Sequence, residues 1–496
     1  NKIAMAQRIL RKLVDHGNTR AWRRPVPIFK AQDNKSPTEV LQVDPKHFQP
    51  LNTWTTEEIK NAVASHVMTT WSPCKAKNDL PIITHSSHIY LYDSDGKEYI
   101  DWTSQAVCTN SGHSLSQHVK TAINDQVDNL HFVYGGIAMT EIRARLSSLI
   151  SELLPGDLVG CLFPSSGSEA NEAAITMARR YSGRPKILSF YRSYHGGTQN
   201  SLSATGDFRR HYQQGSADFV KAFNFTPNFF EHAGADEDER VRSALLMLEE
   251  QIISENPESI ASIVVESIPG SAGVLTMPLA YIQGVRAICD KYGILLHIDE
   301  VMCGFGRTGE MWGFQTYPGV LPDIVTSAKG LSSSIAPISF VAVNERMMEF
   351  FEDNAPGWGS TFQGHPVAMA AAYANLTEML TTNLVGHVQS VAPAFYEHMR
   401  HCAEVHPSIK GFRALGLYGA LDIATPDGEQ PHEVHEARTA ATNKYFEATR
   451  QNGLLGLFRP PHIHIAPPLI ISEEEIQEGF DRQHRALDVL DEELGF

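Results

Sequence analysis

Lys329 stands where a lysine amine can do chemistry. It follows the apolar run Ile324 to Ser327 and is flanked by the small residues Ala328 and Gly330. If this run is a buried strand, the side chain reaches inward, and desolvation lowers the pKa of the amine and favours attack on a carbonyl group. A lysine taken alone is more often ordinary solvated surface, so its interpretation depends on the residues that accompany it.

Asp299 closes another apolar run, Ile294 to Asp299, thirty residues before the lysine. A carboxylate rarely ends such a run without a partner, because burying an unpaired charge is costly. One suitable partner is the protonated nitrogen of an aromatic heterocycle, which a carboxylate keeps cationic and electron-withdrawing. A metal ion or an ordinary salt bridge is an equally acceptable partner for this carboxylate.

Two earlier turns have ligand-binding character. In the segment 163–172, small residues follow an apolar run, and Ser166 and Glu169 have capping-box spacing, so a helix start with free N–H groups can hold a phosphate. In the segment 191–197, Tyr194 stands beside His195 and Gly196, where an aromatic ring can stack on a flat heterocycle. A well-capped helix and a core tyrosine in a turn are the plain alternatives.

The elements that must position these residues lie between about 110 and 345. Helix-like stretches such as Ser168 to Arg180 and Tyr281 to Tyr292 separate the apolar runs, and this alternation predicts an α/β fold with a mainly parallel sheet covered on both faces. Ligands of such sheets lie outside the carboxyl ends of the strands, where all four segments fall. The predicted strands are Val159 to Phe163, Lys186 to Phe190, Ile260 to Glu266, Ile294 to Asp299, Ile324 to Ser327 and Ile338 to Val343.

The rest of the chain predicts a smaller α+β part. Residues 82–101 alternate around the turn Asp93 to Gly96, which indicates a hairpin. Short strands are expected at Tyr418 to Ile423 and His462 to Ile465, with a last helix after Ser472. The predicted divisions are an extension and connector (1–54), an N-terminal segment joining the small domain (55–109), a large cofactor-binding domain (110–375) and a C-terminal small domain (376–496).

Composition excludes several classes of function. A net charge of −16, from 41 basic and 57 acidic side chains, argues against nucleic-acid binding as the main task. The longest apolar stretches fall far short of a membrane span. Six scattered cysteines without a C-x-x-C pair favour free thiols over a disulfide framework.

The first thirty residues are rich in arginine and lysine and contain a single acid, Asp15. This composition fits the remnant of a mitochondrial presequence or a basic helix that packs on the body or on a partner subunit. Localisation therefore stays open between the cytoplasm and the mitochondrial matrix.

Two other patterns are rejected. Residues 304–309 spell G-x-G-x-x-G, but a dinucleotide site needs this motif to open a helix, and Trp312-Gly313 and Pro318-Gly319 follow instead. His462 and His464 share one strand face without an evident third ligand, so we predict no metal site.

Taken in order, the four segments make the chain resemble the class III (ω-) aminotransferases, which have the fold-type I architecture and use pyridoxal 5'-phosphate (PLP). The resemblance spans about residues 60–490. It is carried by Ser-Gly-Ser-Glu-Ala-Asn-Glu at 166–172, Tyr-His-Gly at 194–196, Asp-Glu-Val at 299–301, Gly-Phe-Gly-Arg-Thr-Gly at 304–309, Ala-Lys-Gly at 328–330, Gly-Ser-Thr-Phe-Gln-Gly-His-Pro at 359–366 and Ala-Pro-Pro-Leu at 466–469.

The resemblance implies a role for each matching residue. Lys329 forms the Schiff base with PLP and shuttles the proton, and Asp299 pairs with the ring nitrogen. The family is dimeric, with active sites at the interface, so Thr361 would reach the phosphate of the neighbouring subunit. The other implied cofactor contacts are Ser166, Gly167, Ser168, Tyr194, His195, Val301 and Glu266, the last in a stretch where Ser267 replaces the family's proline.

Two departures from the family pattern bear on the substrates. Members that act on glutamate or 2-oxoglutarate carry an arginine where this chain has His464, and a switching glutamate where it has Ser271. The segments 101–105 and 191–198 look more like the branch that moves amino groups from taurine, β-alanine or amines, often to pyruvate. Arg459 lies near the place of that branch's mobile carboxylate-binding arginine, although it can equally be a surface residue.

Trp71 and Val107 are expected as walls of the substrate pocket, and Phe132 and Tyr134 can reach across the dimer; all four can also be core residues. A 2-oxoglutarate-using aminotransferase, an aminomutase or decarboxylase on the same scaffold, and a non-catalytic relative remain alternatives. The presence of both Lys329 and Asp299 argues against the last.

Overall fold

The computed structural model describes residues 44–213, 215–225, 234–424 and 436–496. By its contacts the chain forms two units, Asn1–Thr55 and Thr56–Phe496, which are described separately. In the first, the described residues form a short 3-10 helix (Pro45–Phe48) that begins where the Asp44 side chain accepts a hydrogen bond from the Lys46 N–H. The basic residues 1–30 lie outside the described residues.

A seven-stranded sheet dominates the described part of the second unit, in the order β4-β10-β9-β8-β7-β5-β6. Only β10 runs antiparallel to its neighbours, β4 and β9, so the sheet is mainly parallel. The strands are β4 (Leu158–Leu162), β5 (Lys186–Phe190), β6 (Phe219–Ala222), β7 (Ile260–Glu266), β8 (Leu295–Asp299), β9 (Ile324–Ser327) and β10 (Phe340–Asn344).

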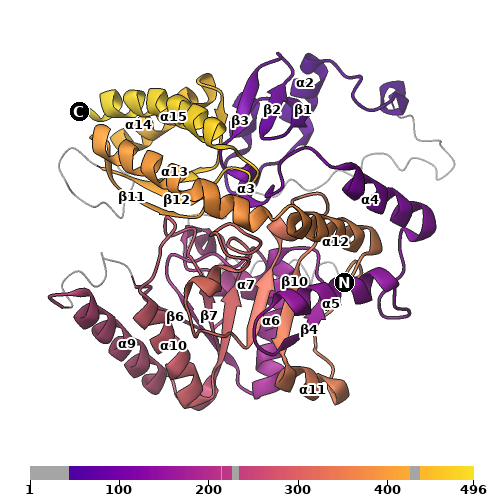
Figure 1. The fold of residues 1–496 in the computed structure, drawn as a ribbon, viewed down its shortest axis with the longest axis vertical. Coiled ribbons are helices and arrows are strands. Elements are labelled where there is room, and N and C mark those ends of the chain that lie inside the picture. The colour runs from indigo at the N-terminus through magenta and orange to yellow at the C-terminus, as the bar shows by residue number, and fades with distance from the viewer. Residues whose placement is uncertain (1–43, 214, 226–233, 425–435) are drawn as a thin grey trace, which may run out of the picture. The chain divides into compact units, whose positions relative to one another are not determined.

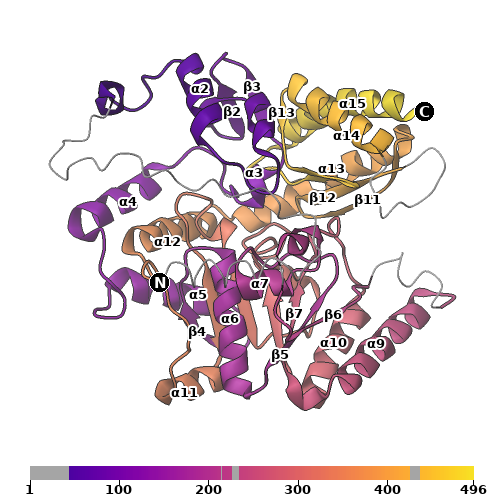
Figure 2. The same cartoon turned by 180° about the vertical axis from the view of Figure 1, so that it is seen from behind.

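Helices surround this sheet (Figure 1). Helix α6 packs along β7, β8, β9 and β10, behind the sheet in Figure 1 and in front of it in Figure 2. Helices α9 and α10 pack on each other, α5 and α11 contact β4, and α12 packs on α4 and α5. Their bounds are α4 (Gln117–Leu130), α5 (Glu141–Leu153), α6 (Gly167–Ser182), α7 (Gln199–Ala204), α9 (Glu237–Ser254), α10 (Leu279–Tyr292), α11 (Glu345–Asp353) and α12 (Pro366–Thr381).

Two smaller sheets join distant parts of the chain. In one, the predicted hairpin β2–β3 is extended by β1 on one side and by a parallel strand, β13, from the C-terminal region on the other. The second sheet, β11-β12-β15-β14, is antiparallel. The remaining elements are α2 (Thr56–His66), β1 (Ile83–Ser87), β2 (Tyr90–Asp93), β3 (Glu98–Asp101), α3 (Ser104–Val107), α13 (Leu384–Val405), β11 (Ile409–Leu415), β12 (Tyr418–Ile423), α14 (Glu436–Gln451), β13 (Leu454–Leu455), β14 (Phe458–Arg459), β15 (His462–Ile465) and α15 (Glu473–Leu494).

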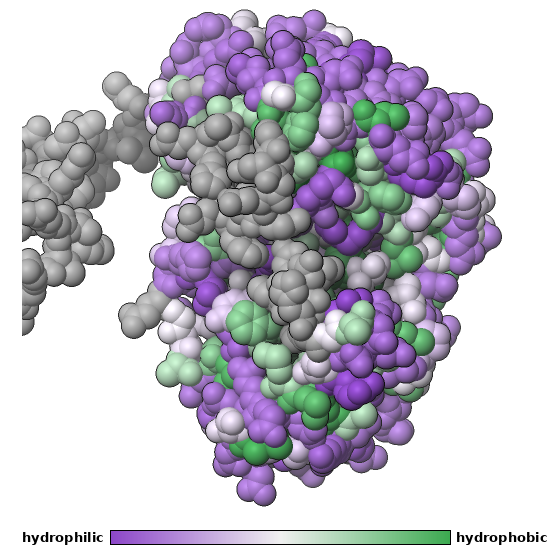
Figure 3. Space-filling model, turned by 90° about the vertical axis from the view of Figure 1, so that its left-hand side faces the viewer, coloured by the Kyte–Doolittle hydropathy of each residue, from purple (hydrophilic) through white to green (hydrophobic). Residues whose placement is uncertain are grey.

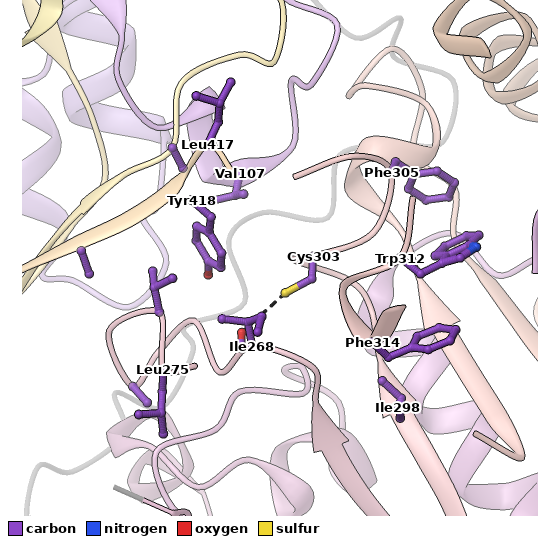
Figure 4. Packing of buried hydrophobic residues seen from close by; sticks show 14 of the residues in the cluster. Val107, Ile268, Leu275, Ile298, Cys303, Phe305, Trp312, Phe314, Leu417 and Tyr418 are labelled. Atoms are coloured by element: carbon purple, nitrogen blue, oxygen red, sulfur yellow. Dashed lines mark hydrogen bonds between the residues drawn. The ribbon is translucent and has the colours of Figure 1, made fainter. Parts of the chain in front are cut away.

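Buried side chains join the large sheet to the β11–β15 sheet. Figure 4 shows Val107, Leu417 and Tyr418 on one side of this core, with Phe305, Trp312 and Phe314 on the other. The Cys303 thiol lies between them and donates a weak hydrogen bond to the Ile268 carbonyl.

Arg307 connects four segments across this core. Its fully buried guanidinium donates to the carbonyls of Leu417 (2.9 Å) and Pro467 (2.7 Å), to Ser104 Oγ (3.0 Å) and to Asn110 Oδ1 (3.2 Å). Burial lowers the pKa of Arg307 to about 10, because the charge is surrounded by neutral acceptors. The turn 304–309 is therefore held by its arginine, and no helix begins in it.

The predicted α/β architecture is confirmed. The strands β5, β7, β9, β12 and β15 have the predicted bounds, and the bounds of β4, β8 and β10 shift by one or two residues. The helix after Ser472 is confirmed with its capping box. Among the described residues, no helix has the length and apolarity needed to cross a membrane. The predicted domain boundaries remain a prediction.

Candidate active site

A sharp turn presents the amine of Lys329 at the carboxyl end of β9. Lys329 has φ of +41°, in the left-handed region that non-glycine residues rarely adopt, and a side chain at Gly330 would overlap Asn110. The Nζ atom contacts the sulfur of Met302. Desolvation lowers the pKa of Lys329, and the positive charge of Arg459 acts in the same direction. Both effects increase the fraction of neutral, nucleophilic amine.

Asp299, at the carboxyl end of β8, is a buried carboxylate with oriented donors. Its Oδ2 accepts hydrogen bonds from His195 Nδ1 and Asn171 Nδ2, both at 2.8 Å, and its Oδ1 accepts one from the Val301 N–H at 3.0 Å. Burial alone would raise the pKa of Asp299, but the hydrogen bond and charge of His195 and the Val301 N–H hold it below its usual value. The carboxylate is therefore ionised and can stabilise a cationic nitrogen brought against it.

The predicted anion-binding segment forms the N-terminus of α6. Ser166 Oγ accepts from the Glu169 N–H, while the Glu169 carboxylate accepts from the Ser165 N–H. The N–H groups of Gly167 and Ser168 have no acceptor among the described residues. A Cβ at Gly167 would lie 3.0 Å from both methyl groups of Val301, so the two predicted cofactor contacts are neighbours.

The loop after β5 places Tyr194 beside Glu266, which ends β7. The Tyr194 N–H donates to Glu266 Oε1, and the Gly270 N–H donates to Glu266 Oε2, both at 2.9 Å. Burial raises the pKa of Glu266, and the negative charge of Asp299 acts in the same direction. Glu266 therefore binds the Tyr194 backbone and lies close to Asp299, so these three residues are neighbours.

Arg209 covers one face of the Tyr194 ring, with its guanidinium carbon 3.5 Å from the ring centroid. The guanidinium pairs with Asp207 and donates to Ser271 Oγ at 2.9 Å. Arg209 is buried, and this cation–π contact fixes the plane of the ring. Arg209, Asp207 and their contact with Ser271 were not predicted from the sequence.

Arg459 on β14 is a largely buried cation. Its charge acts on both Lys329 and Tyr194, so the three groups are neighbours. Burial lowers the pKa of Arg459, and the charge of Arg209 lowers it further. No carboxylate in the described ranges lies within ion-pairing distance of it, which leaves the guanidinium able to bind an anionic group of a ligand.

The two expected pocket walls lie in different environments. Trp71 is 43% exposed, lies close to Gly197, and has the Arg209 guanidinium 6.0 Å from its ring. It therefore stands at the mouth of the site. Val107 is buried with Leu417 and Tyr418 in the core of Figure 4, where packing accounts for it.

His462 and His464 do not converge on a common ligand. His462 Nδ1 bonds to Asp422, which also pairs with Arg413, and the two imidazole rings lie 6.4 Å apart. His464 Nε2 donates to the Gly270 carbonyl at 2.9 Å, and burial lowers the pKa of His464 to about 4. His464 is neutral near pH 7, so it does not supply the positive charge of an arginine.

The donor set fits PLP. An N-terminal helix turn offers free N–H groups to a phosphate, Asp299 offers an ionised carboxylate to a ring nitrogen, and Lys329 offers an amine to an aldehyde. The imidazole Nε2 of His195 is buried without a hydrogen-bond partner in the described structure, so it also remains for a ligand. Thr361 is exposed and makes no hydrogen bond to these residues within the described chain.

Comparison with known proteins agrees with this chemistry. Residues 73–487 match the family model of class III aminotransferases. The chain is 34% identical over 369 residues to the hypotaurine/taurine–pyruvate aminotransferase of Paracoccus denitrificans, covering 71% of this chain and 79% of that protein. It is 31% identical over 445 residues to the diaminobutyrate–2-oxoglutarate transaminase of Halomonas elongata, covering 84% and 93%.

The fold also matches that of a solved relative. The taurine:2-oxoglutarate aminotransferase from Bifidobacterium kashiwanohense, in complex with PLP and glutamate, has a TM-score of 0.81 and 34% identity, covering 88% of this chain and 99% of that one. The fold-type I architecture and the PLP cofactor predicted from sequence are thereby confirmed. The chain belongs to the class III aminotransferases, enzymes that use PLP to move amino groups between amino and keto acids.

Proposed function

We propose that this aminotransferase moves the amino group of an ω-amino acid or amine, such as taurine or β-alanine, to a keto acid, with pyruvate as the acceptor. Arg459 carries the proposal, because it is a largely buried cation beside Lys329 that no carboxylate of the described residues neutralises. A guanidinium in such a place binds the carboxylate of a keto acid bidentately. Trp71 at the mouth would limit the size of the donor.

The chain's own residues supply the rest of the chemistry. Bound PLP supplies an aldehyde and an electron-withdrawing ring. Asp299 would keep the ring nitrogen protonated, and Gly167 and Ser168 would hold the phosphate with their N–H groups. Tyr194, fixed by Arg209, orients the ring. Lys329 would hold the aldehyde of bound PLP through its Nζ, and as a free amine the same Nζ would move the proton of the substrate carbon.

The surroundings of Arg459 favour a monocarboxylate acceptor. Ser271 accepts a hydrogen bond from Arg209 and brings no carboxylate to pair with Arg459, while neutral His464 brings no second charge for a dicarboxylate. The second candidate acceptor is 2-oxoglutarate, because the relatives from Halomonas elongata and Bifidobacterium kashiwanohense are named for it.

A donor panel against pyruvate and 2-oxoglutarate tests the proposal, together with Arg459→Gln. Losing a charge-assisted hydrogen bond costs about 1.5–3 kcal/mol, so the KM for pyruvate should rise roughly 10- to 150-fold. Arg400→Gln, which removes an exposed cation from α13, is the matched control and should leave the KM unchanged. An unchanged pyruvate KM in Arg459→Gln would remove that residue from the site. Release of carbon dioxide, or turnover without any keto acid, would indicate a decarboxylase or an aminomutase instead.

We also propose a homodimer in which Thr361 completes the phosphate site of the neighbouring subunit. Phe362, the exposed neighbour of Thr361 in sequence, lies 5.8 Å from the half-buried Phe132 between ring centroids, and the exposed Tyr134 and Ile137 lie in the same loop as Phe132. A stable interface needs such an apolar surface. Sedimentation analysis of the PLP-loaded enzyme should give twice the chain mass, and an active monomer would contradict the proposal.

A further inference from the structure

Histidines and carboxylates gather where α13 and α15 come together, and no step proposed above uses them. His406 directly follows α13 and is 5% exposed. On α15, His484, Asp488 and Asp491 are spaced by four and three residues, so they share the helix face that is turned toward His406. The cluster joins two of the longest helices in the described chain.

Three ligand atoms of this cluster lie close enough to share one ion. His406 Nδ1 is 2.7 Å from Asp491 Oδ2 and 3.9 Å from Asp488 Oδ1, and all three atoms lie within 4.8 Å of one another. We propose that His406, Asp488 and Asp491 form a binding site for a divalent metal ion, with Zn²⁺ as the preferred occupant.

The ligand set and spacing suit Zn²⁺. Zinc takes imidazole nitrogen and carboxylate oxygen at about 2.0–2.2 Å in a tetrahedron, which sets neighbouring ligand atoms roughly 3.3 Å apart. These two separations differ from this value by about 0.6 Å in opposite directions, and the third is at most 4.8 Å, so side-chain movements of roughly 0.5–1.5 Å would bring the three atoms into place. Two carboxylates also balance the charge of a divalent cation, whereas Mg²⁺ or Ca²⁺ would require more oxygen ligands.

Neighbouring groups already orient the ligands. His406 Nε2 lies 2.8 Å from His484 Nδ1, so His406 can donate its second N–H while Nδ1 faces the metal. Asp491 Oδ1 accepts a hydrogen bond from the Ser408 N–H at 2.9 Å, and Oδ2 pairs with His406 Nδ1, so a metal ion would take the place of the proton between these last two atoms. Ligands held in this way lose little conformational entropy when the metal binds.

Solvent can reach the site from one side. The Asp488 side chain is 72% exposed, while His406 and Asp491 lie beneath it. The upper part of the face in Figure 3, which lies on the side of the C-terminus, is mostly hydrophilic. An ion can therefore enter past Asp488 and keep water in its fourth position.

The site would act as a cross-link between α13 and α15. Its ligands come from the end of one helix and the last turns of the other, so an ion bound to the folded state alone stabilises their packing. None of the three ligands is among the residues that surround Lys329, and the inference does not rest on the proposed function.

The test uses the PLP-loaded full chain with Co²⁺ as a spectroscopic substitute for Zn²⁺. We expect visible d–d bands of a tetrahedral site that Zn²⁺ abolishes, and a rise in Tm on adding Zn²⁺. Asp488→Asn should weaken Co²⁺ binding by at least about tenfold and remove the rise in Tm. Because Asp488 is exposed and its ion pair with His406 is long, this variant should fold.

Two further variants make the result specific. Asp290→Asn removes an exposed carboxylate from α10 and should leave Co²⁺ binding unchanged. His484→Gln retains a partner for His406 Nε2 and should retain the d–d bands. The proposal is overturned if Co²⁺ gives no such bands, or if Asp488→Asn and the unsubstituted enzyme bind it equally well.

Discussion

Replacing Asp299 with asparagine tests the electrostatics of the proposed cofactor site. The new side chain would be nearly isosteric and could still accept the Val301 N–H. Its amide would face His195 Nδ1, and His195 can respond by moving its proton to Nε2, which has no partner to lose in the described structure. Asn171 would lose one acceptor and keep the His195 carbonyl at 2.7 Å.

The substitution is expected to cost less in folding stability than in catalysis. One buried N–H left without an acceptor costs about 1–3 kcal/mol, which a protein of this size tolerates. Loss of one partner of a buried hydrogen-bonded charge pair costs about 2–5 kcal/mol, so kcat should fall roughly 30- to 5000-fold. The variant should therefore bind PLP as a folded protein and be slow.

The assay compares two cofactors in the same variant. A PLP analogue methylated at the ring nitrogen is permanently cationic and needs no carboxylate to keep its charge. We expect Asp299→Asn to be slow with PLP and to recover at least about tenfold in kcat with the analogue. If the variant is within about threefold of the unsubstituted enzyme with PLP, the assignment of Asp299 is refuted. If the analogue gives no recovery although it binds, the carboxylate acts by positioning alone.

Three other substitutions test the active site and the stability of the fold around it. Lys329→Ala should lower kcat by about 10⁴-fold or more and remove the absorbance of lysine-bound PLP. Activity near the original level would refute the assignment of Lys329 as the catalytic lysine. Gly196→Ala places a Cβ 2.8 Å from the Ser168 Cα at φ of 138°, so PLP binding should weaken and Tm should fall, whereas Gly183→Ala at a helix C-cap, where no atom lies within 4 Å, should affect Tm alone. Burial raises the pKa of Glu300 from 4.5 to about 7, so the folded state holds more protons than the unfolded state between these values and loses stability as pH rises through them, by about 3 kcal/mol. The free energy of unfolding of Glu300→Gln, from denaturant titrations, should lack this fall; parallel pH profiles would contradict the reasoning.

The large sheet was predictable because its strands are continuous apolar runs. β5 begins directly after Pro185 and β9 directly after Asp323, and every residue of β7 and β9 is buried, so the run itself marks the strand. β6 was missed because three of its four residues are half-buried at the edge of the sheet and one of them is Lys221. Likewise β13 is only two residues long and exists through its parallel pairing with β3, a contact that local patterns do not encode.

The site residues that belong to family motifs were predictable from the sequence. The residues that contact them from other parts of the chain were less predictable. Lys329, Asp299 and Tyr194 each follow or close a strand, so topology alone brings them to one edge. Arg209 lies in a short 3-10 helix without a distinctive local pattern, and its importance appears only when its guanidinium is seen on the Tyr194 ring. The same holds for His406, which is nearly eighty residues from His484 in sequence and 2.8 Å from it in space.

The contacts of Arg307 have a consequence for biosynthesis. Two of its acceptors, in Ser104 and Asn110, are translated before it, while the carbonyls of Leu417 and Pro467 follow more than a hundred residues later. A guanidinium cannot be buried while half of its acceptors are still missing, since the uncompensated charge stays in water. The turn 304–309 of a nascent chain would then remain unlocked until Leu417 and Pro467 have left the ribosome. Cofactor capture would come after that point, and products truncated before Pro467 would not retain PLP.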